Sequence, residues 1–130
     1  MLSLLDRRIF FRVEPTDMRW GIDRLASWVQ GALGADPYAG DAFVFVGRDR
    51  RRVKVLVWDR SGYWLAMKRL ESGRFAPPRP VVVNGSAMTV NLSSAELAMV
   101  LEGITVHKAT YHAHYRRREA EITCAPQAEL

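Results

Sequence analysis

Hydrophobic and polar positions alternate with two different periods in the first part of the chain. In the segment 8–13, apolar residues at positions 9, 11 and 13 alternate with arginines and Phe10, which predicts a β-strand with one buried face. Thr16 is typical of a helix N-cap, and Gly31 and Gly34 are typical of a helix end. Between them an apolar stripe at helical spacing predicts an amphipathic helix. The stripe consists of Met18, Ile22, Leu25, Val29 and Leu33.

The middle of the chain has the composition of consecutive β-strands. Segments 42–46 and 53–58 are rich in β-branched and aromatic residues, and 63–70 continues in the same manner. Asp59 and Gly62 stand at the first and fourth positions of a four-residue connection, which predicts a type I turn. The sequence therefore predicts three strands joined by short turns, and such strands pair antiparallel.

The last regular part predicts a hairpin followed by a second helix. Asn84-Gly85 favours a tight turn between the strands 81–83 and 88–92. Ser93 and Glu96 have the spacing of a capping box, which marks a helix start, and Gly103 is the predicted stop. The predicted buried face of this helix consists of Leu97, Leu101 and Ile104.

This order of elements predicts an α+β fold. We expect an antiparallel sheet of about four to six strands with two main helices packed on it. Residues 1–104 are predicted to form this single domain, and residues 105–130 to form a basic, mobile C-terminal tail.

Composition limits the class of protein further. The longest apolar runs fall far short of a membrane span, and the N-terminal segment lacks the apolar core of a signal peptide. With a single cysteine, Cys124, the 130-residue chain has no intramolecular disulfide. We therefore expect a cytoplasmic protein without membrane contact. The formal net charge is +5, but residues 46–75 hold nine Lys or Arg against three Asp or Glu, a balance of +6.

Motifs for catalysis are missing. All three histidines lie at or beyond position 107, and there is no phosphate-binding loop, dinucleotide fingerprint or serine nucleophile elbow. Four carboxylates are weak candidates for a two-metal nuclease, since each has a turn, helix-start or ion-pair role: Asp17, Asp23, Asp59 and Glu71. His107, His112 and His114 form an equally weak zinc candidate. We expect a non-enzymatic protein with neither metal nor cofactor.

Nucleic acid is the strongest chemical candidate as a partner. Arginines on the hairpin loop 47–52 can neutralise phosphates. Trp58, Tyr63 and Trp64 on the neighbouring strands can stack on bases if they are exposed. The alternative is a loop of solvated arginines beside aromatic residues that belong to the core. The sequence pattern leaves both interpretations open.

Three separated motifs resemble one known family. They are TDMRWGIDRLASWVQGALGADPYAGDAFVFVGRDRRRVKVLVWD (16–59), GYWLAMKRLESGRFAPP (62–78) and VNLSSAELAMVLEGI (90–104). Together they resemble the TnpB-type, Orf-two-like accessory proteins of the sixty-six family of bacterial insertion sequences. The chain departs from the family pattern at Ala76, where members usually have an aromatic residue before proline. The resemblance implies an accessory protein that acts beside a separate transposase, which would carry the catalytic carboxylates.

Two functional hypotheses follow. The first is DNA binding by a basic surface made of Arg48, Arg50, Arg51, Arg52, Lys54, Lys68, Arg69 and Arg74. The second is a protein-interaction module that docks the transposase or a second copy of itself. Its predicted contact residues are Trp20, Trp58 and Trp64.

Overall fold

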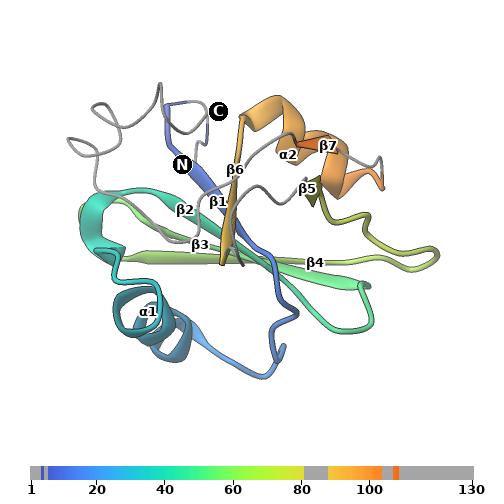
Figure 1. Cartoon of the computed structure of the whole chain (residues 1–130). Helices are drawn as coiled ribbons and strands as arrows, with labels where there is room; N and C mark the ends of the chain where they lie inside the picture. The colour runs from blue at the N-terminus through green and yellow to red at the C-terminus, as the bar shows by residue number, and fades with distance from the viewer. Residues whose placement is uncertain (1–3, 5, 81–87, 104–106, 109–130) are drawn as a thin grey trace.

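The computed structural model describes residues 4, 6–80, 88–103 and 107–108, and a five-stranded sheet forms its centre (Figure 1). The sheet has the strand order β4-β3-β2-β1-β6. Its strands are β1 (Ile9–Arg12), β2 (Ala42–Val46), β3 (Arg52–Trp58), β4 (Tyr63–Arg69) and β6 (Thr89–Leu92). The helices are α1 (Ile22–Gly31), the 3-10 turn η1 (Pro37–Ala39) and α2 (Ser94–Leu101). A second, two-stranded sheet joins β5 (Arg79–Pro80) to β7 (His107–Lys108).

Strand pairing confirms the α+β class and adds one parallel pair. β2, β3 and β4 form an antiparallel meander, as their short connections predict. β1 pairs parallel with β2 and antiparallel with β6, so the sheet is mixed rather than wholly antiparallel. The parallel pair arises because α1 lies between the two strands and carries the chain back to the end of the sheet where β1 began.

The two helices cover opposite faces of the sheet (Figure 1). On the α1 face, Leu25 and Val29 share a cluster with Phe10 of β1. On the α2 face, Leu97 shares a cluster with Phe11 of β1. The prediction of one buried face for the first strand is therefore wrong. β1 lies between β2 and β6 with a layer on each side, so both of its faces exclude water.

Two local predictions are corrected by the backbone. The first helix begins at Ile22 after Gly21, not at Thr16. Thr16 is buried, and its backbone N–H donates to the carbonyl of Val46 at 2.9 Å. The residue that the sequence predicts as a helix N-cap is therefore bonded to the end of β2 instead. The turn after β3 is not type I, because Arg60 has a φ of 85°. A two-residue hairpin connection favours such a primed turn, since its twist matches that of the strands.

The predictions around the second helix are confirmed. The Ser93 hydroxyl accepts a hydrogen bond from the N–H of Glu96, and the Glu96 carboxylate accepts one from the N–H of Ser93, which completes the capping box. Gly103 follows the helix with a φ of 84°, as a helix stop requires. In one detail the buried face differs, because Val100 rather than Leu101 is the fully buried partner of Leu97.

Some predictions fall outside the described residues. Positions 81–83 of the predicted hairpin and Ile104 are among these, and the described strand β6 pairs with β1. Of the predicted C-terminal tail, only residues 107–108 are described, and they pair with β5. None of the described helices is long and apolar enough to cross a membrane.

Candidate nucleic-acid interface

Two segments about twenty residues apart in sequence meet at the end of the sheet. The loop 47–52 joins β2 to β3, and the turn 70–75 follows β4. The N–H of Leu70 donates to the carbonyl of Arg51 at 2.8 Å, and the N–H of Phe75 donates to the carbonyl of Arg50 at 2.6 Å. Phe75 is buried, so it anchors the turn against the core. The arginines of the two segments thereby belong to one surface.

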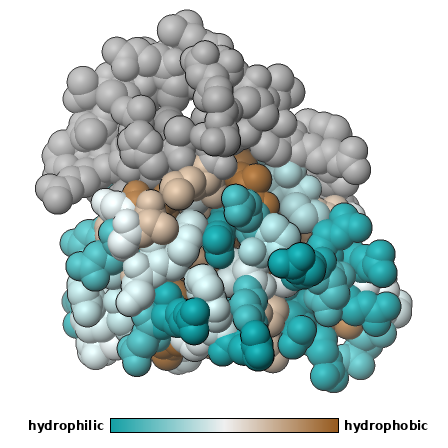
Figure 2. All heavy atoms as spheres, turned by 60° about the horizontal axis from the view of Figure 1, so that its bottom comes forward, coloured by the Kyte–Doolittle hydropathy of each residue, from teal (hydrophilic) through white to brown (hydrophobic). Residues whose placement is uncertain are grey.

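We call this surface the basic end. It comprises Arg48, Arg50, Arg51, Arg52, Lys68, Arg69 and Arg74. In Figure 2 it lies on the right, where hydrophilic residues predominate. Seven cations and two carboxylates, Asp49 and Glu71, leave it with a formal charge of +5.

The two carboxylates neutralise only part of the basic end. Glu71 accepts from Arg69 at 3.1 Å, and Asp49 lies 3.8 Å from Arg52. Both pairs are largely exposed, so each contributes little to stability. Arg48, Arg50, Arg51 and Arg74 form no ion pair with any carboxylate of the described residues, and all four are exposed. These guanidinium groups are therefore available to an external anion.

The loop 47–52, which carries Arg48, Arg50 and Arg51, has a strained backbone. It closes through hydrogen bonds from the N–H of Gly47 to the carbonyl of Arg52 and from the N–H of Arg50 to the carbonyl of Gly47. The Asp49 carboxylate accepts from the N–H of Arg51 at 3.1 Å. Arg50 has a φ of 58°, a region that costs an ordinary residue about 1–2 kcal/mol. Glycine would fit there without that cost.

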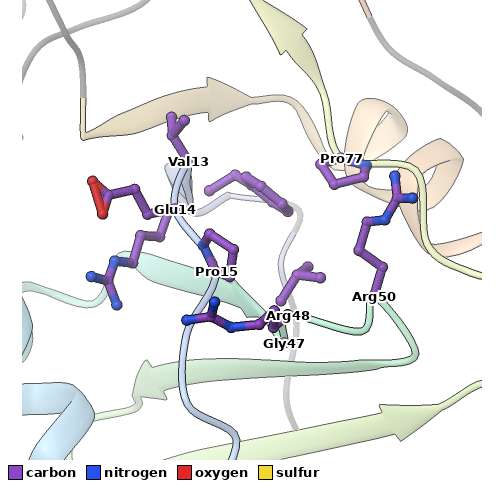
Figure 3. A pocket seen from close by; sticks show the side chains of 10 residues that line it. Val13, Glu14, Pro15, Gly47, Arg48, Arg50 and Pro77 are labelled. Atoms are coloured by element: carbon purple, nitrogen blue, oxygen red, sulfur yellow. The ribbon is translucent and has the colours of Figure 1, made fainter.

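Two hollows lie at the foot of the basic end and share Pro15 and Arg48 as walls. The first, of about 270 Å³, has a mainly apolar lining that includes Phe11 and Val46. Arg50 extends beside Pro77 at its rim (Figure 3). The second, of about 420 Å³, is lined by arginines and by two carboxylates. Arginines of the basic end therefore line both hollows.

Lys54, predicted as a phosphate contact, is placed differently. Its ammonium donates to the carbonyls of Met18 and Trp20, at 2.8 Å each. These bonds hold the segment before α1 onto β3. Because both acceptors belong to the fold and both bonds are short, we leave Lys54 out of the basic end. Lys68 stays in, since its side chain is exposed and its bond to the carbonyl of Leu101 is 3.5 Å long.

The predicted partner-binding tryptophans do not form one surface. Trp20 is half-buried and lies 4.9 Å from the guanidinium carbon of Arg24. Trp58 is also half-buried, beside Tyr63 on the α1 face of the sheet. Trp64 is 44% exposed and lies on the opposite face, since its neighbour in register is Val57 of the α2-side cluster. The sequence pattern could not separate the two faces.

An aromatic cluster lies at the start of β4, away from the basic end. Tyr38, Trp58 and Tyr63 have ring centroids 4.8–5.7 Å apart. Burial, followed by the neighbouring Tyr38 and the carboxylates of Asp36 and Asp23, raises the pKa of Tyr63 to about 12. The cluster and the basic end therefore occupy opposite ends of β4.

Two exposed residues were missed by sequence reasoning. Tyr38, in the loop before β2, is 57% exposed, and Met67 of β4 is 58% exposed. The position of Met67 could have been found from the sequence, because an edge strand pairs on one side only and leaves apolar side chains exposed along its length. No sequence signal indicated Tyr38, because the position of its ring depends on packing against Trp58, which is distant in sequence.

The carboxylates considered for a metal site are dispersed. Asp17 accepts from Arg19 at 2.8 Å, and Asp59 accepts from the indole N–H of Trp64 at 2.5 Å. Glu71 lies at the other end of β4 from Asp59. Within the described residues, no three His, Cys, Asp or Glu side chains gather as a metal site would require. His112, His114 and Cys124 lie outside those residues.

The family comparison places this chain among the accessory proteins of insertion sequences. The family model described as "IS66 Orf2 like protein" matches residues 7–111, and the chain belongs to this family. Two relatives from Sinorhizobium fredii are the uncharacterized proteins y4jC and y4hO. Over 97 residues they are 38% and 39% identical, which covers 75% of this chain and 79% and 80% of theirs. No solved structure matches the chain.

Proposed function

We propose that this accessory protein binds duplex DNA through the basic end and carries out no catalysis itself. The observation that carries the proposal is the union of the loop 47–52, the end of β4 with Lys68 and Arg69, and the turn 70–75 into one surface of charge +5. A surface of this kind neutralises phosphates and releases their counterions. The strained φ of Arg50 supports the same role, because a cation stands at a position where glycine fits better.

Duplex DNA is favoured over single strands by the position of the aromatic residues. Proteins that bind single strands combine a basic groove with aromatic rings on which bases stack. In this chain the exposed aromatic residues Tyr38 and Trp64 stand near the start of β4, and the basic end lies around and beyond its last residue, Arg69. Trp64 and Lys68, which are four strand residues apart, are separated by about 13 Å, which is too far for stacking and phosphate contact within one nucleotide. Backbone phosphates are then the ligand.

The test compares two double charge reversals. Arg50→Glu with Arg51→Glu changes the basic end, and Arg24→Glu with Arg60→Glu makes the same change elsewhere. Each pair lowers the formal net charge from +5 to +1. We expect the first pair to weaken duplex binding at least about tenfold more than the second, with a shallower salt dependence. Equal effects of the two folded variants would reject the basic end as the DNA site.

A second candidate is docking to the separate transposase without direct DNA contact. The observation that favours it is the exposure of Trp64 and Met67 on the edge strand β4. Co-purification with the element's transposase, before and after nuclease treatment, separates the two functions. Association that survives nuclease and is lost in Trp64→Ala supports docking. Association that disappears with the DNA supports the first proposal.

A further inference from the structure

The outer edge of β4 has a regular set of open backbone groups. In the described part of the chain β4 pairs with β3 alone. The N–H of Asp59 donates to the carbonyl of Gly62, and the N–H of Leu70 donates to the carbonyl of Arg51. Hydrogen-bonded pairs alternate along an antiparallel ladder, so even-numbered residues of β4 are bonded to β3. The residues whose backbone groups point outward are Tyr63, Leu65, Met67 and Arg69.

We propose that β4 pairs antiparallel with β4 of a second copy of this chain, centred on Ala66, and joins the two sheets into one. In this register Tyr63 stands opposite Arg69 and Leu65 stands opposite Met67. All four have outward backbone groups, so each pair can exchange two hydrogen bonds. The register also uses every residue of the strand Tyr63–Arg69.

Side chains along β4 complement one another in the same register. Opposite residues of an antiparallel pair share a face of the sheet. The exposed indole of Trp64 therefore stands opposite the exposed side chain of Lys68 from the second copy, and a cation–aromatic contact there would replace the 3.5 Å bond from the ammonium to the carbonyl of Leu101. Tyr63 meets Arg69 on the other face. Leu65 meets Met67, which is 58% exposed in one copy and loses part of that exposure in the pair.

Charge along the strand also favours this partner. The last residues of β4 belong to the basic end. Asp59 lies beside its first residues, and the carboxylates of Asp36 and Asp23 lie near Tyr63. Arg60 offsets part of that negative charge. Antiparallel pairing brings the basic end of each copy to the carboxylates of the other, whereas parallel pairing would place the two basic ends together.

A two-fold axis through the Ala66 pair follows from this arrangement. Ala66 belongs to a pair that is not hydrogen-bonded across the new ladder, where Cα atoms lie about 4.5 Å apart. That separation suits a disulfide bond. Ala66→Cys in a Cys124→Ser background is therefore expected to form a covalent dimer under mild oxidation. Lys68→Cys in the same background is the control, because each Lys68 faces Trp64 and not its own equivalent.

The outcome of cross-linking decides the register. A dimer from Ala66→Cys and none from Lys68→Cys supports the proposal. Efficient cross-linking of Met67→Cys instead would place the axis one residue further along, and it would overturn the register centred on Ala66. Failure of all three variants to cross-link, at high protein concentration, would overturn the proposal as a whole.

Sedimentation without DNA tests the same interface through charge, so its result does not depend on the proposed DNA binding. Trp64→Lys sets a lysine opposite Lys68 of the other copy and is expected to weaken the dimer about tenfold. Adding Lys68→Glu restores opposite charges and should restore the dimer. Met99→Lys, on the exposed side of α2, is the control and leaves the dimer constant unchanged.

Two results of the sedimentation experiment contradict the proposal. They are a wild-type chain that stays monomeric and a folded Trp64→Lys dimer of unchanged strength. Co-purification in which a monomer docks the transposase at Trp64 would contradict the proposal as well. Each would leave the proposed DNA binding intact, because Arg48, Arg50, Arg51 and Arg74 of the basic end lie outside β4.

Discussion

Arg52 of β3 and Arg69 of β4 lie directly opposite each other on the same face of the sheet. Like charges in this position destabilise a strand pair, and the carboxylates of Asp49 and Glu71 relieve the repulsion only from the exposed side. The fold therefore tolerates a small repulsion at the surface that we propose for DNA. Removing one charge should strengthen the fold and weaken binding, because the two requirements conflict at this pair.

Arg69→Thr tests this conflict. We expect the free energy of unfolding to rise by a few tenths of a kcal/mol, up to about 1 kcal/mol, since the cross-strand repulsion is removed. Duplex affinity should fall. Lys68→Thr is the control, because Lys68 stands opposite Val53 and has no like charge across the ladder. Urea titration and DNA binding are measured on both variants, and a destabilised Arg69→Thr would refute the repulsion.

The two arginines at positive φ offer a second prediction. Arg50 and Arg60 have φ values of 58° and 85°, so replacement of either by glycine should relieve strain and stabilise the fold by about 1 kcal/mol. Their effects on DNA should differ. Arg50→Gly removes a cation of the basic end and lowers affinity, whereas Arg60→Gly acts at the opposite end of β4. Equal losses of affinity would argue against a localised site.

Gly47 is expected to be intolerant of any side chain. A Cβ atom there would lie 2.7 Å from Cγ of Met18, inside van der Waals contact. Gly47→Ala should therefore lower the free energy of unfolding by about 1–3 kcal/mol. Gly31→Ala is the matched control, since a Cβ at the last residue of α1 meets nothing within 4 Å and alanine favours helix. Thermal unfolding should shift down for the first variant and up, or not at all, for the second.

The ion pair between Arg8 and Asp41 ties β1 to the start of β2. Arg8 donates from Nε at 3.0 Å and from Nη2 at 2.8 Å to the two oxygens of a fully buried carboxylate. Asp41→Ala leaves the partly buried guanidinium without this partner and should cost about 3–5 kcal/mol. Asp17→Ala removes an exposed pair with Arg19 and should leave the urea midpoint unchanged. Similar midpoints for the two variants would show that the buried pair is dispensable.

Lowering the pH should weaken the hydrogen bond between Asp59 and Trp64, because it protonates the Asp59 carboxylate. The indole N–H donates to the carboxylate at 2.5 Å and lowers the pKa of Asp59. A carboxyl whose folded pKa is depressed contributes stability above its unfolded pKa of about 3.9 and loses that contribution as pH falls through the folded value. Tryptophan fluorescence should therefore change below about pH 4. The change should be absent in Asp59→Asn. If the pH profile of fluorescence is the same in the wild type and in Asp59→Asn, the change arises from another group.

Local signals predicted the parts of the fold that depend on near neighbours. The capping box at Ser93 and Glu96 is formed by residues three apart, so no distant contact is needed to complete it. The strands β2 and β3 were likewise predicted from their own composition. The prediction of the first helix start failed because Thr16 is engaged by a hydrogen bond to Val46, which is distant in sequence. The parallel pairing of β1 and β2 was missed for the same reason, since register is set between distant segments.

What the sequence determined by itself was the class of fold, the family and the density of arginine around residues 46–75. The tertiary structure decided which of those cations share a surface. Backbone hydrogen bonds from Leu70 to Arg51 and from Phe75 to Arg50 bring the cations of the basic end together. Lys54 is not part of it, because its ammonium donates to two carbonyls of the segment before α1. The physical reason is that charge is a property of each residue, whereas a binding surface depends on strand register and on which face of the sheet each side chain occupies.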